Sequence, residues 1–205
     1  MTDTILLTGF EPFGGEIINP AWEVTRLLDG YVCGEYTVVS RQLPCTFSSS
    51  SEVLYQLIKE HQPKVVLCLG QAGGLADIAI EKVALNWIDA KIADNLGDQP
   101  IDRSIVVDAP LAYFANLDSK SILSALRLAN IPCHISYSAG SYVCNYVFYS
   151  LMHYIHNHAS SNLKGGFIHI PYLPEQTLDN NQPSMLLTEM IAGLKVVLNA
   201  VAADV

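Results

Sequence analysis

Residues 64–74 read Lys-Val-Val-Leu-Cys-Leu-Gly-Gln-Ala-Gly-Gly and decide the fold class of this chain. The run Lys64–Leu69 has the length of one strand, and its apolar residues do not alternate with polar ones, which is typical of a strand covered on both faces. Thr4–Thr8 is a similar apolar run, and Phe167–Ile170 is a third predicted strand, which ends at Pro171. These runs predict strands at the centre of a sheet.

Segments with helical periodicity alternate with the predicted strands. This alternation predicts a mainly parallel sheet with helices on both faces. The sequence contains no repeat, low-complexity tract or clear linker, so we expect one domain over residues 1–205. The other predicted strands are Glu35–Leu43, Asp77–Leu85 and Cys133–Tyr137. The predicted helices are Pro20–Asp29, Ser48–His61, Ser119–Ala129, Ser141–His156 and Ser184–Ala202.

The composition argues against nucleic acids and membranes as partners. The 205 residues include 11 Lys plus Arg and 20 Asp plus Glu, and the formal net charge is −9. An acidic surface repels the phosphates of nucleic acids and of anionic lipids. Half of the residues are hydrophobic, but no apolar run reaches the roughly 20 residues of a membrane-spanning helix. The N-terminal residues do not resemble a secretory signal, so we expect a cytoplasmic protein whose five cysteines are free thiols.

Ligands of parallel α/β sheets bind outside the carboxyl ends of the strands. Four segments of this chain follow predicted strands and are rich in glycine or in reactive side chains. We therefore expect them to meet in space and to form the site. They are Gly9–Gly15, Gly70–Gly74, Ala139–Asn145 and His169–Pro171.

Cys144 is the strongest candidate for a nucleophile among the cysteines. It lies in the first turn of the helix predicted from Ser141. Unpaired N–H groups and a partial positive charge at a helix start favour a thiolate and can also hold an oxyanion. Cys68 lies within an apolar strand and is expected to pack as a small hydrophobic residue. Position alone leaves Cys144 open to the same interpretation.

A thiol nucleophile needs a base, and His169 is the best placed of the six histidines. It lies near the carboxyl end of its strand, where a hydrogen-bonded core histidine is the alternative. His153 and His156 have the spacing of two metal ligands, but no nearby acid or cysteine completes a site, so we predict no metal. His134 lies within a strand and is expected to pack or bond locally.

A neutral histidine base needs an acceptor for its second ring nitrogen, and Glu81 is the candidate. Alternation within the strand Asp77–Leu85 puts Glu81 on a small apolar face, where a carboxylate needs a partner. A salt bridge with Lys82 or Lys91 is the alternative. Four acids in loop-like positions compete for the same role: Asp77, Asp89, Asp94 and Asp98.

The glycine-rich loops match no dinucleotide-binding or Walker motif. Gly73 and Gly74 still leave open a phosphate cradle of the kind that nucleoside phosphorylases use. Phe10 and Phe13 favour a small apolar pocket for a flat ring, unless they only fix the loop to the core. Residues 86–117 carry turn signals but no regular period, and such a long segment inside a compact domain is usually functional.

Five motifs in order resemble the pyroglutamyl-peptidase I family of cysteine peptidases, also called pyrrolidone-carboxylate peptidases. They extend over most of the chain. They are TGFEPFGG (Thr8–Gly15) with Asn19-Pro20, LGQAGG (Leu69–Gly74) with Glu81, DNLGDQP (Asp94–Pro100), AGSYVCN (Ala139–Asn145) and GGFIHIPYLP (Gly165–Pro174). The resemblance implies a three-layer α/β/α fold with a mainly parallel, mixed central sheet, similar to that of phosphorylases and hydrolases.

The same resemblance implies an activity and the residues that perform it. An N-terminal pyroglutamyl residue would be removed from a peptide through a thioester on Cys144, with His169 as general base and acid and Glu81 as its orienting partner. Lys91 and Asp94 fall at supporting positions. The resemblance implies no cofactor, pyroglutamyl-terminated peptides as partners and a homotetramer. The residues implied around the pyroglutamyl ring are Phe10, Phe13, Asn19, Gln71, Ile92 and Val143.

The chain departs from the family pattern at two positions of one loop. Lys91 and Ala93 stand where members of the family commonly carry Arg and Pro. Lysine keeps the charge that is expected to support the oxyanion but lacks the planar fork of arginine. Two alternatives therefore stay open: a binding protein for pyroglutamyl peptides with weakened catalysis, and a nucleoside-phosphorylase-like enzyme on the same architecture.

Overall fold

A computed structural model describes residues 3–158 and 162–204. Within them a main sheet has seven strands in the order β2-β3-β1-β4-β9-β5-β8, and β6 pairs separately with β7. The strands are β1 (Asp3–Phe10), β2 (Val32–Cys33), β3 (Tyr36–Leu43), β4 (Val65–Gln71), β5 (Ile78–Glu81), β6 (Val83–Leu85), β7 (Ala112–Phe114), β8 (Cys133–Ser136) and β9 (Lys164–Ile170). The helices are α1 (Pro20–Leu27), α2 (Ser50–His61), α3 (Ser119–Leu128), α4 (Val143–Asn157), the 3-10 helix η2 (Pro174–Gln176) and α5 (Leu187–Ala202).

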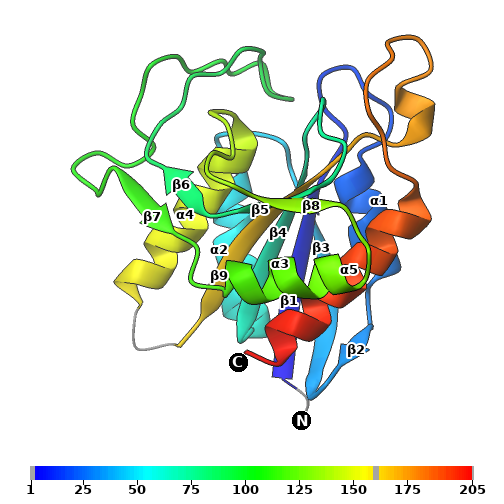
Figure 1. Cartoon of the computed structure of the whole chain (residues 1–205). Coiled ribbons are helices and arrows are strands. Elements are labelled where there is room, and N and C mark those ends of the chain that lie inside the picture. The colour runs from blue at the N-terminus through cyan, green and yellow to red at the C-terminus, as the bar shows by residue number, and fades with distance from the viewer. Residues whose placement is uncertain (1–2, 159–161, 205) are drawn as a thin grey trace.

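Helices cover both faces of the main sheet (Figure 1). Helices α1, α3 and α5 pack on one face, over strand residues that include Leu67 and Ile78. Helices α2 and α4 pack on the other face, over Leu6 and Phe167. All seven residues of β4 are buried, as its lack of alternation predicts. The expected three-layer α/β/α architecture is confirmed.

The main sheet is mixed, which also agrees with the expectation. Strands β3, β1, β4 and β9 run parallel to one another, whereas β5 is antiparallel to β9 and β8 is parallel to β5. The first residues of β5 and β8 therefore lie at the edge where β4 and β9 end. Ala79 consequently pairs with His169 on one side and with His134 on the other.

Strand β9 begins three residues before the predicted Phe167. The earlier residues include two glycines, which the sequence patterns do not favour in a strand. A Cβ atom on Gly165 would lie 2.6 Å from Cδ1 of Ile155, and one on Gly166 would lie 2.6 Å from Cδ1 of Leu117. The glycines thus allow side chains on both faces of the sheet to reach the strand.

The prediction of one strand over Asp77–Leu85 is wrong. The segment divides after Glu81, so that β5 belongs to the main sheet and β6 pairs with β7. At the division, the Lys82 N–H donates to the Ser136 carbonyl, and the Lys82 carbonyl accepts from the Ala115 N–H. The apolar alternation therefore continues across two different sheets.

Residues 86–117 are largely irregular, as expected, although they include the unpredicted strand β7. Side-chain amides hold this backbone. Oδ1 of Asn86 accepts from the N–H groups of Ile105 and Val106, and Nδ2 of Asn145 donates to the carbonyls of Leu85 and Trp87. The segment forms the green loops at the upper left of Figure 1. Within residues 3–158 and 162–204, no helix has the length and apolar character needed to cross a membrane.

Candidate active site

Cys144 lies directly over Gly70 in β4. A Cβ atom on Gly70 would lie 2.8 Å from Sγ of Cys144, so glycine leaves the space that the thiol occupies. Gly70 pairs in register with His169 on β9, and neighbouring strands lie about 5 Å apart. The sheet therefore brings the predicted nucleophile and the predicted base to the same place.

The start of α4 positions Cys144. The helix begins at Val143, so Cys144 lies in its first turn, as predicted. Gly140 has φ of 80°, a left-handed conformation that glycine adopts without strain, and it turns the chain before the helix. The side chain of the N-cap residue Tyr142 accepts no hydrogen bond from the first turn. The N–H groups of that turn are thus available to a ligand.

Burial acts on the Cys144 thiol against the helix start, which the sequence analysis expects to favour a thiolate. Burial raises the pKa of Cys144 well above its ordinary value, and the nearby Cys45, Glu81 and Cys68 raise it further, against a smaller lowering by its own backbone N–H. Desolvation therefore outweighs the helix terminus. A thiol in this state needs a base to take its proton.

His169 and Glu81 form a buried pair next to the thiol. Nδ1 of His169 lies 2.8 Å from Oε1 of Glu81, and the two side chains are 7% and 2% exposed. Ala79 lies opposite His169, so Glu81 follows two residues along β5 on the same face. Lys82, the alternative partner of Glu81, instead donates through Nζ to the carbonyl of Ala115.

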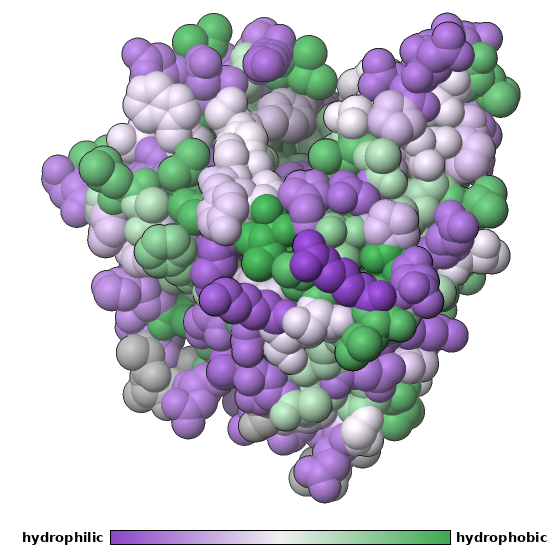
Figure 2. Space-filling model, viewed as in Figure 1, coloured by the Kyte–Doolittle hydropathy of each residue, from purple (hydrophilic) through white to green (hydrophobic). Residues whose placement is uncertain are grey.

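A cavity of about 370 Å³ opens beside these three residues. Figure 2 shows the molecule hollowed there, between two raised groups of loops at the top of the view. The volume is typical of a small-ligand site. All four segments predicted to meet contribute to its wall, through residues that include Phe13, Gln71, Gly140 and His169.

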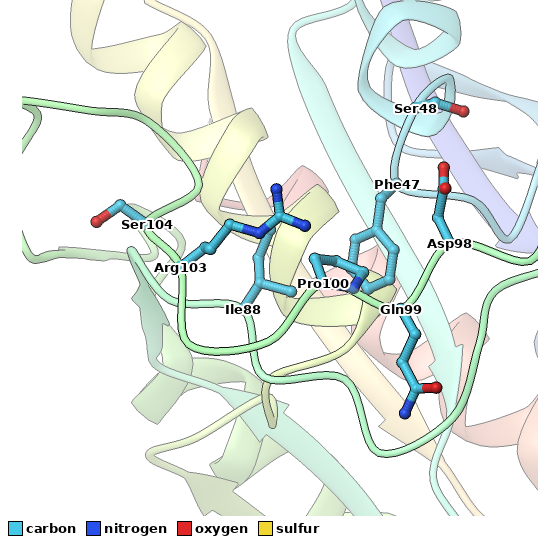
Figure 3. A pocket seen from close by; sticks show the side chains of 8 residues that line it. All are labelled: Phe47, Ser48, Ile88, Asp98, Gln99, Pro100, Arg103 and Ser104. Carbon is cyan, nitrogen blue, oxygen red and sulfur yellow. The ribbon is translucent and has the colours of Figure 1, made fainter.

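A second cavity, of about 350 Å³, lies next to the loop of residues 98–104 (Figure 3). Its wall carries the guanidinium group of Arg103 and the carboxylate of Asp98 around the ring of Phe47. The residues that line it include neither a thiol nor an imidazole. The first cavity is therefore the candidate active site.

Comparisons with known proteins agree with this geometry. A family model described as pyroglutamyl peptidase matches residues 3–204. The pyrrolidone-carboxylate peptidase of Cupriavidus taiwanensis is 49% identical over 193 residues, which cover 94% of this chain and 89% of that protein. That of Bacillus mycoides is 48% identical over 203 residues, which cover 98% of this chain and 94% of the relative.

The fold agrees equally well with solved structures. The crystal structure of pyroglutamyl peptidase I from Bacillus amyloliquefaciens has a TM-score of 0.95 at 44% identity, covering 98% of this chain and 97% of that one. A mutant pyrrolidone carboxyl peptidase from Pyrococcus furiosus has a TM-score of 0.94 at 40% identity, covering 98% and 99%. The chain belongs to the pyroglutamyl peptidase family. This is the family that the five motifs resemble.

In this member of the pyroglutamyl peptidase family, two of the predicted ring-binding residues line the cavity. They are Phe13 and Gln71. The Phe13 ring packs against Tyr142, with the ring centroids 5.8 Å apart. Oε1 of Gln71 accepts a hydrogen bond from Nε2 of Gln176 at 3.0 Å. The cavity wall here is aromatic and uncharged.

The side chains of the other predicted ring-binding residues lie outside the cavity lining. Phe10 and Val143 are buried in the core. Asn19 is buried too, and it caps α1 through Oδ1 while its Nδ2 donates to the carbonyl of Glu11. Ile92 is 46% exposed, on the loop next to the glycine-rich segment. These residues shape the loops around the cavity.

The two predicted supporting residues lie on one loop. Lys91 is exposed, and it forms no ion pair with any residue that the structure describes. Asp94 is buried, and its carboxylate accepts from the backbone N–H groups of Phe47, Leu96 and Asp98. Asp94 thus ties the loop to the rest of the protein.

The side chains of the cavity wall that sequence reasoning did not single out include Tyr142, Tyr172 and His134. Tyr142 lies two residues before Cys144, and its hydroxyl donates to the carbonyl of Ala93. Tyr172 packs so closely on Gly73 that a Cβ atom there would lie 2.5 Å from the Tyr172 hydroxyl. The signal that could have found the tyrosines was their position, because Tyr142 lies within the predicted segment Ala139–Asn145 and Tyr172 directly follows His169–Pro171.

Proposed function

We propose that Cys144, His169 and Glu81 form the catalytic triad of this pyroglutamyl peptidase. The observation that carries the proposal is the buried 2.8 Å contact between His169 and Glu81, in register with the glycine over which the thiol lies. In this arrangement Oε1 of Glu81 accepts a hydrogen bond from the N–H group at Nδ1 of His169. Nε2 is then free to act as a base.

The chemistry proceeds through a thioester. As the sulfur of Cys144 attacks the carbonyl carbon that joins the lactam ring to the next residue, its proton moves to Nε2 of His169. The C–N bond then breaks, and His169 gives that proton to the leaving amine. Water next attacks the thioester while His169 takes one of its protons. The sulfur leaves with that proton, releasing pyroglutamate and restoring the thiol.

Backbone N–H groups at the start of α4 are suited to the oxyanion. The N-cap side chain leaves them unoccupied, and a donor of this kind contributes about 2.7–4 kcal/mol to transition-state stabilisation. Lys91 is exposed on the neighbouring loop, and its positive charge gives the oxyanion additional support. Asp94, Asn19 and Ile92 act indirectly, by holding the loops around the substrate.

The ring of the substrate is uncharged, and the wall around Phe13 and Gln71 suits it. An aromatic surface packs against the flat lactam, while an amide side chain matches its polar edge. Phe10 and Val143 support that wall from the core. The substrates that fit are peptides that begin with a pyroglutamyl residue.

Hydrolysis of pyroglutamyl p-nitroanilide, before and after treatment with iodoacetamide, tests the proposal. We expect cleavage that alkylation abolishes, and no cleavage by Cys144→Ala. Cys133 is the cysteine that is not fully buried, so Cys133→Ala is the matched control and should remain active and sensitive to alkylation.

Cleavage that survives iodoacetamide, or that persists in Cys144→Ala, would contradict the triad. Tight binding of a pyroglutamyl peptide without cleavage would instead support the binding protein. Phosphate-dependent cleavage of a nucleoside would support the phosphorylase-like enzyme.

We also propose that the protein forms a homo-oligomer, a tetramer as the resemblance implies. Large apolar side chains on residues 86–117 point to solvent, including Val107 at 79%, Leu111 at 86% and Phe114 at 68% exposure. Sedimentation velocity tests this, and Leu111→Lys should shift the protein toward smaller species. A monomer at all concentrations would contradict it.

A cytoplasmic location is the last part of the proposal. All five cysteines are free, as expected in a reducing compartment. Fractionation of the source cells, with the activity as the marker, tests the location.

A further inference from the structure

A second histidine–carboxylate pair lies beside the same cavity, with its histidine in the cavity wall. Nδ1 of His134 lies 3.0 Å from both Oδ1 and Oδ2 of Asp77. The side chains are 42% and 28% exposed, and that of His134 lines the cavity. Nε2 of His134 forms no hydrogen bond with any residue that the structure describes.

The two pairs are arranged on either side of Ala79. His169 and His134 are its partners on the neighbouring strands β9 and β8, so both imidazoles project from the same face of the sheet. Glu81 follows Ala79 by two residues and holds His169, whereas Asp77 precedes it by two residues and holds His134. Two strand spacings separate the histidine backbones, which is about 10 Å.

The order of the strands indicates which part of the substrate reaches His134. Across the sheet Gln71 lies on β4, His169 on β9, Ala79 on β5 and His134 on β8. A pyroglutamyl ring held near Phe13 and Gln71 places the scissile amide beside His169. The peptide beyond that amide then continues across the small side chain of Ala79 toward His134.

Asp77 also determines what His134 offers to a peptide. Because the carboxylate accepts from Nδ1, the neutral imidazole presents Nε2 as a hydrogen-bond acceptor. The natural partner is a peptide N–H. A substrate carboxylate at the same place would instead face the negative charges of Asp77 and Glu81.

We propose that His134, held by Asp77, accepts a hydrogen bond from the N–H that follows the first residue after pyroglutamate. The pair thus forms a subsite for the leaving peptide and disfavours pyroglutamyl dipeptides that end there in a free carboxylate. This inference rests on the proposed pyroglutamyl peptidase activity. His134 binds and selects substrate, while His169 performs the proton transfers.

Three substrates separate these roles. Pyroglutamyl-alanine amide carries the N–H in question, pyroglutamyl-alanine replaces it with a carboxylate, and pyroglutamyl p-nitroanilide lacks both. The unchanged protein should prefer the amide to the acid. In His134→Ala, kcat/KM for the amide relative to the p-nitroanilide should fall about tenfold, the usual effect of one hydrogen bond.

Asp77→Asn provides a second variant of nearly unchanged shape. It removes the negative charge that lies behind His134, so the preference for the amide over the acid should narrow several-fold. His156→Ala is the matched control, because His156 is an exposed histidine on the last turn of α4 and should leave all three ratios unchanged.

Unchanged ratios in both His134→Ala and Asp77→Asn would overturn the subsite while leaving the peptidase intact. An equal loss on all three substrates would also overturn it, because His134 would then act on folding or on the chemical step. If the unchanged protein cleaves none of the three, the proposed function fails, and the subsite fails with it.

Discussion

The two histidine–carboxylate pairs of this protein lie on either side of Ala79 in β5 and have the same chemistry and nearly the same contact distance, but not the same environment. Glu81 and His169 are 2.8 Å apart and almost completely buried. Asp77 and His134 are 3.0 Å apart and partly exposed. Burial prevents water from competing for the inner pair and leaves the outer pair open to a ligand. In the roles that we propose, position relative to Cys144, rather than residue type, separates proton transfer by His169 from substrate binding by His134.

Among the variants that test this comparison, Glu81→Gln should lower kcat the most. A glutamine does not hold the proton of His169 on Nδ1, and a wrong tautomer in a related triad lowers kcat about 10,000-fold. Asp77→Asn, the same change in the outer pair, should lower kcat less than tenfold. The measurement is kcat on pyroglutamyl p-nitroanilide, with thermal melts to establish folding. Equal losses in the two variants would remove the distinction between the pairs.

Gly70→Ala should have the next largest effect on kcat, because a Cβ atom there would crowd the thiol of Cys144 and the ring of Phe167 but neither residue of the outer pair. The new methyl group would lie 2.8 Å from Sγ of Cys144 and must displace the thiol. A displacement of about 1 Å costs on the order of a hundredfold in rate. Gly165→Ala is the matched control. It crowds Ile155, which lies in the last turn of α4, at the opposite end of that helix from Cys144. It should lower the melting temperature but retain kcat.

The smallest expected effect concerns the buried thiols beneath the site. Burial raises the pKa of Cys68 to about 12, whereas an unfolded cysteine has a pKa of about 8.5. The unfolded chain therefore loses its proton first, and stability falls as the pH rises from about 8.5 toward 12. At pH 10 the loss is about 2 kcal/mol. Cys68→Ala should lose less stability between pH 7.5 and 10 in chemical denaturation, and an unchanged loss would contradict this.

Much of the fold was predictable because its central strands are continuous apolar runs. Lys64–Leu69 and Thr4–Thr8 identified buried strands, and the helices between them carry regular periodicity. The division of Asp77–Leu85 was not predictable, because alternation looks the same whether it continues in one sheet or passes to another. Strand β7 was missed because its neighbours are held by the amides of Asn86 and Asn145, which leave no periodic pattern.

For the site, the motifs pointed to Cys144, His169 and Glu81, the triad that we propose, and the structure brings these three residues together. The pKa of Cys144 could not be predicted, because it depends on burial by distant segments rather than on the helix start alone. The contact between Asp77 and His134 could not be predicted from the sequence either. The two residues lie 57 positions apart, and their contact follows from the register of β5 with β8.

The central claim is that the inner pair activates Cys144 to form a thioester, and trapping that thioester is its most direct test. The protein would be quenched in acid during turnover of pyroglutamyl p-nitroanilide and mapped by mass spectrometry. We predict one pyroglutamyl group on the peptide that contains Cys144, and none in Cys144→Ala. Steady hydrolysis with the group on another residue, or hydrolysis by Cys144→Ala at the original rate, would contradict the account.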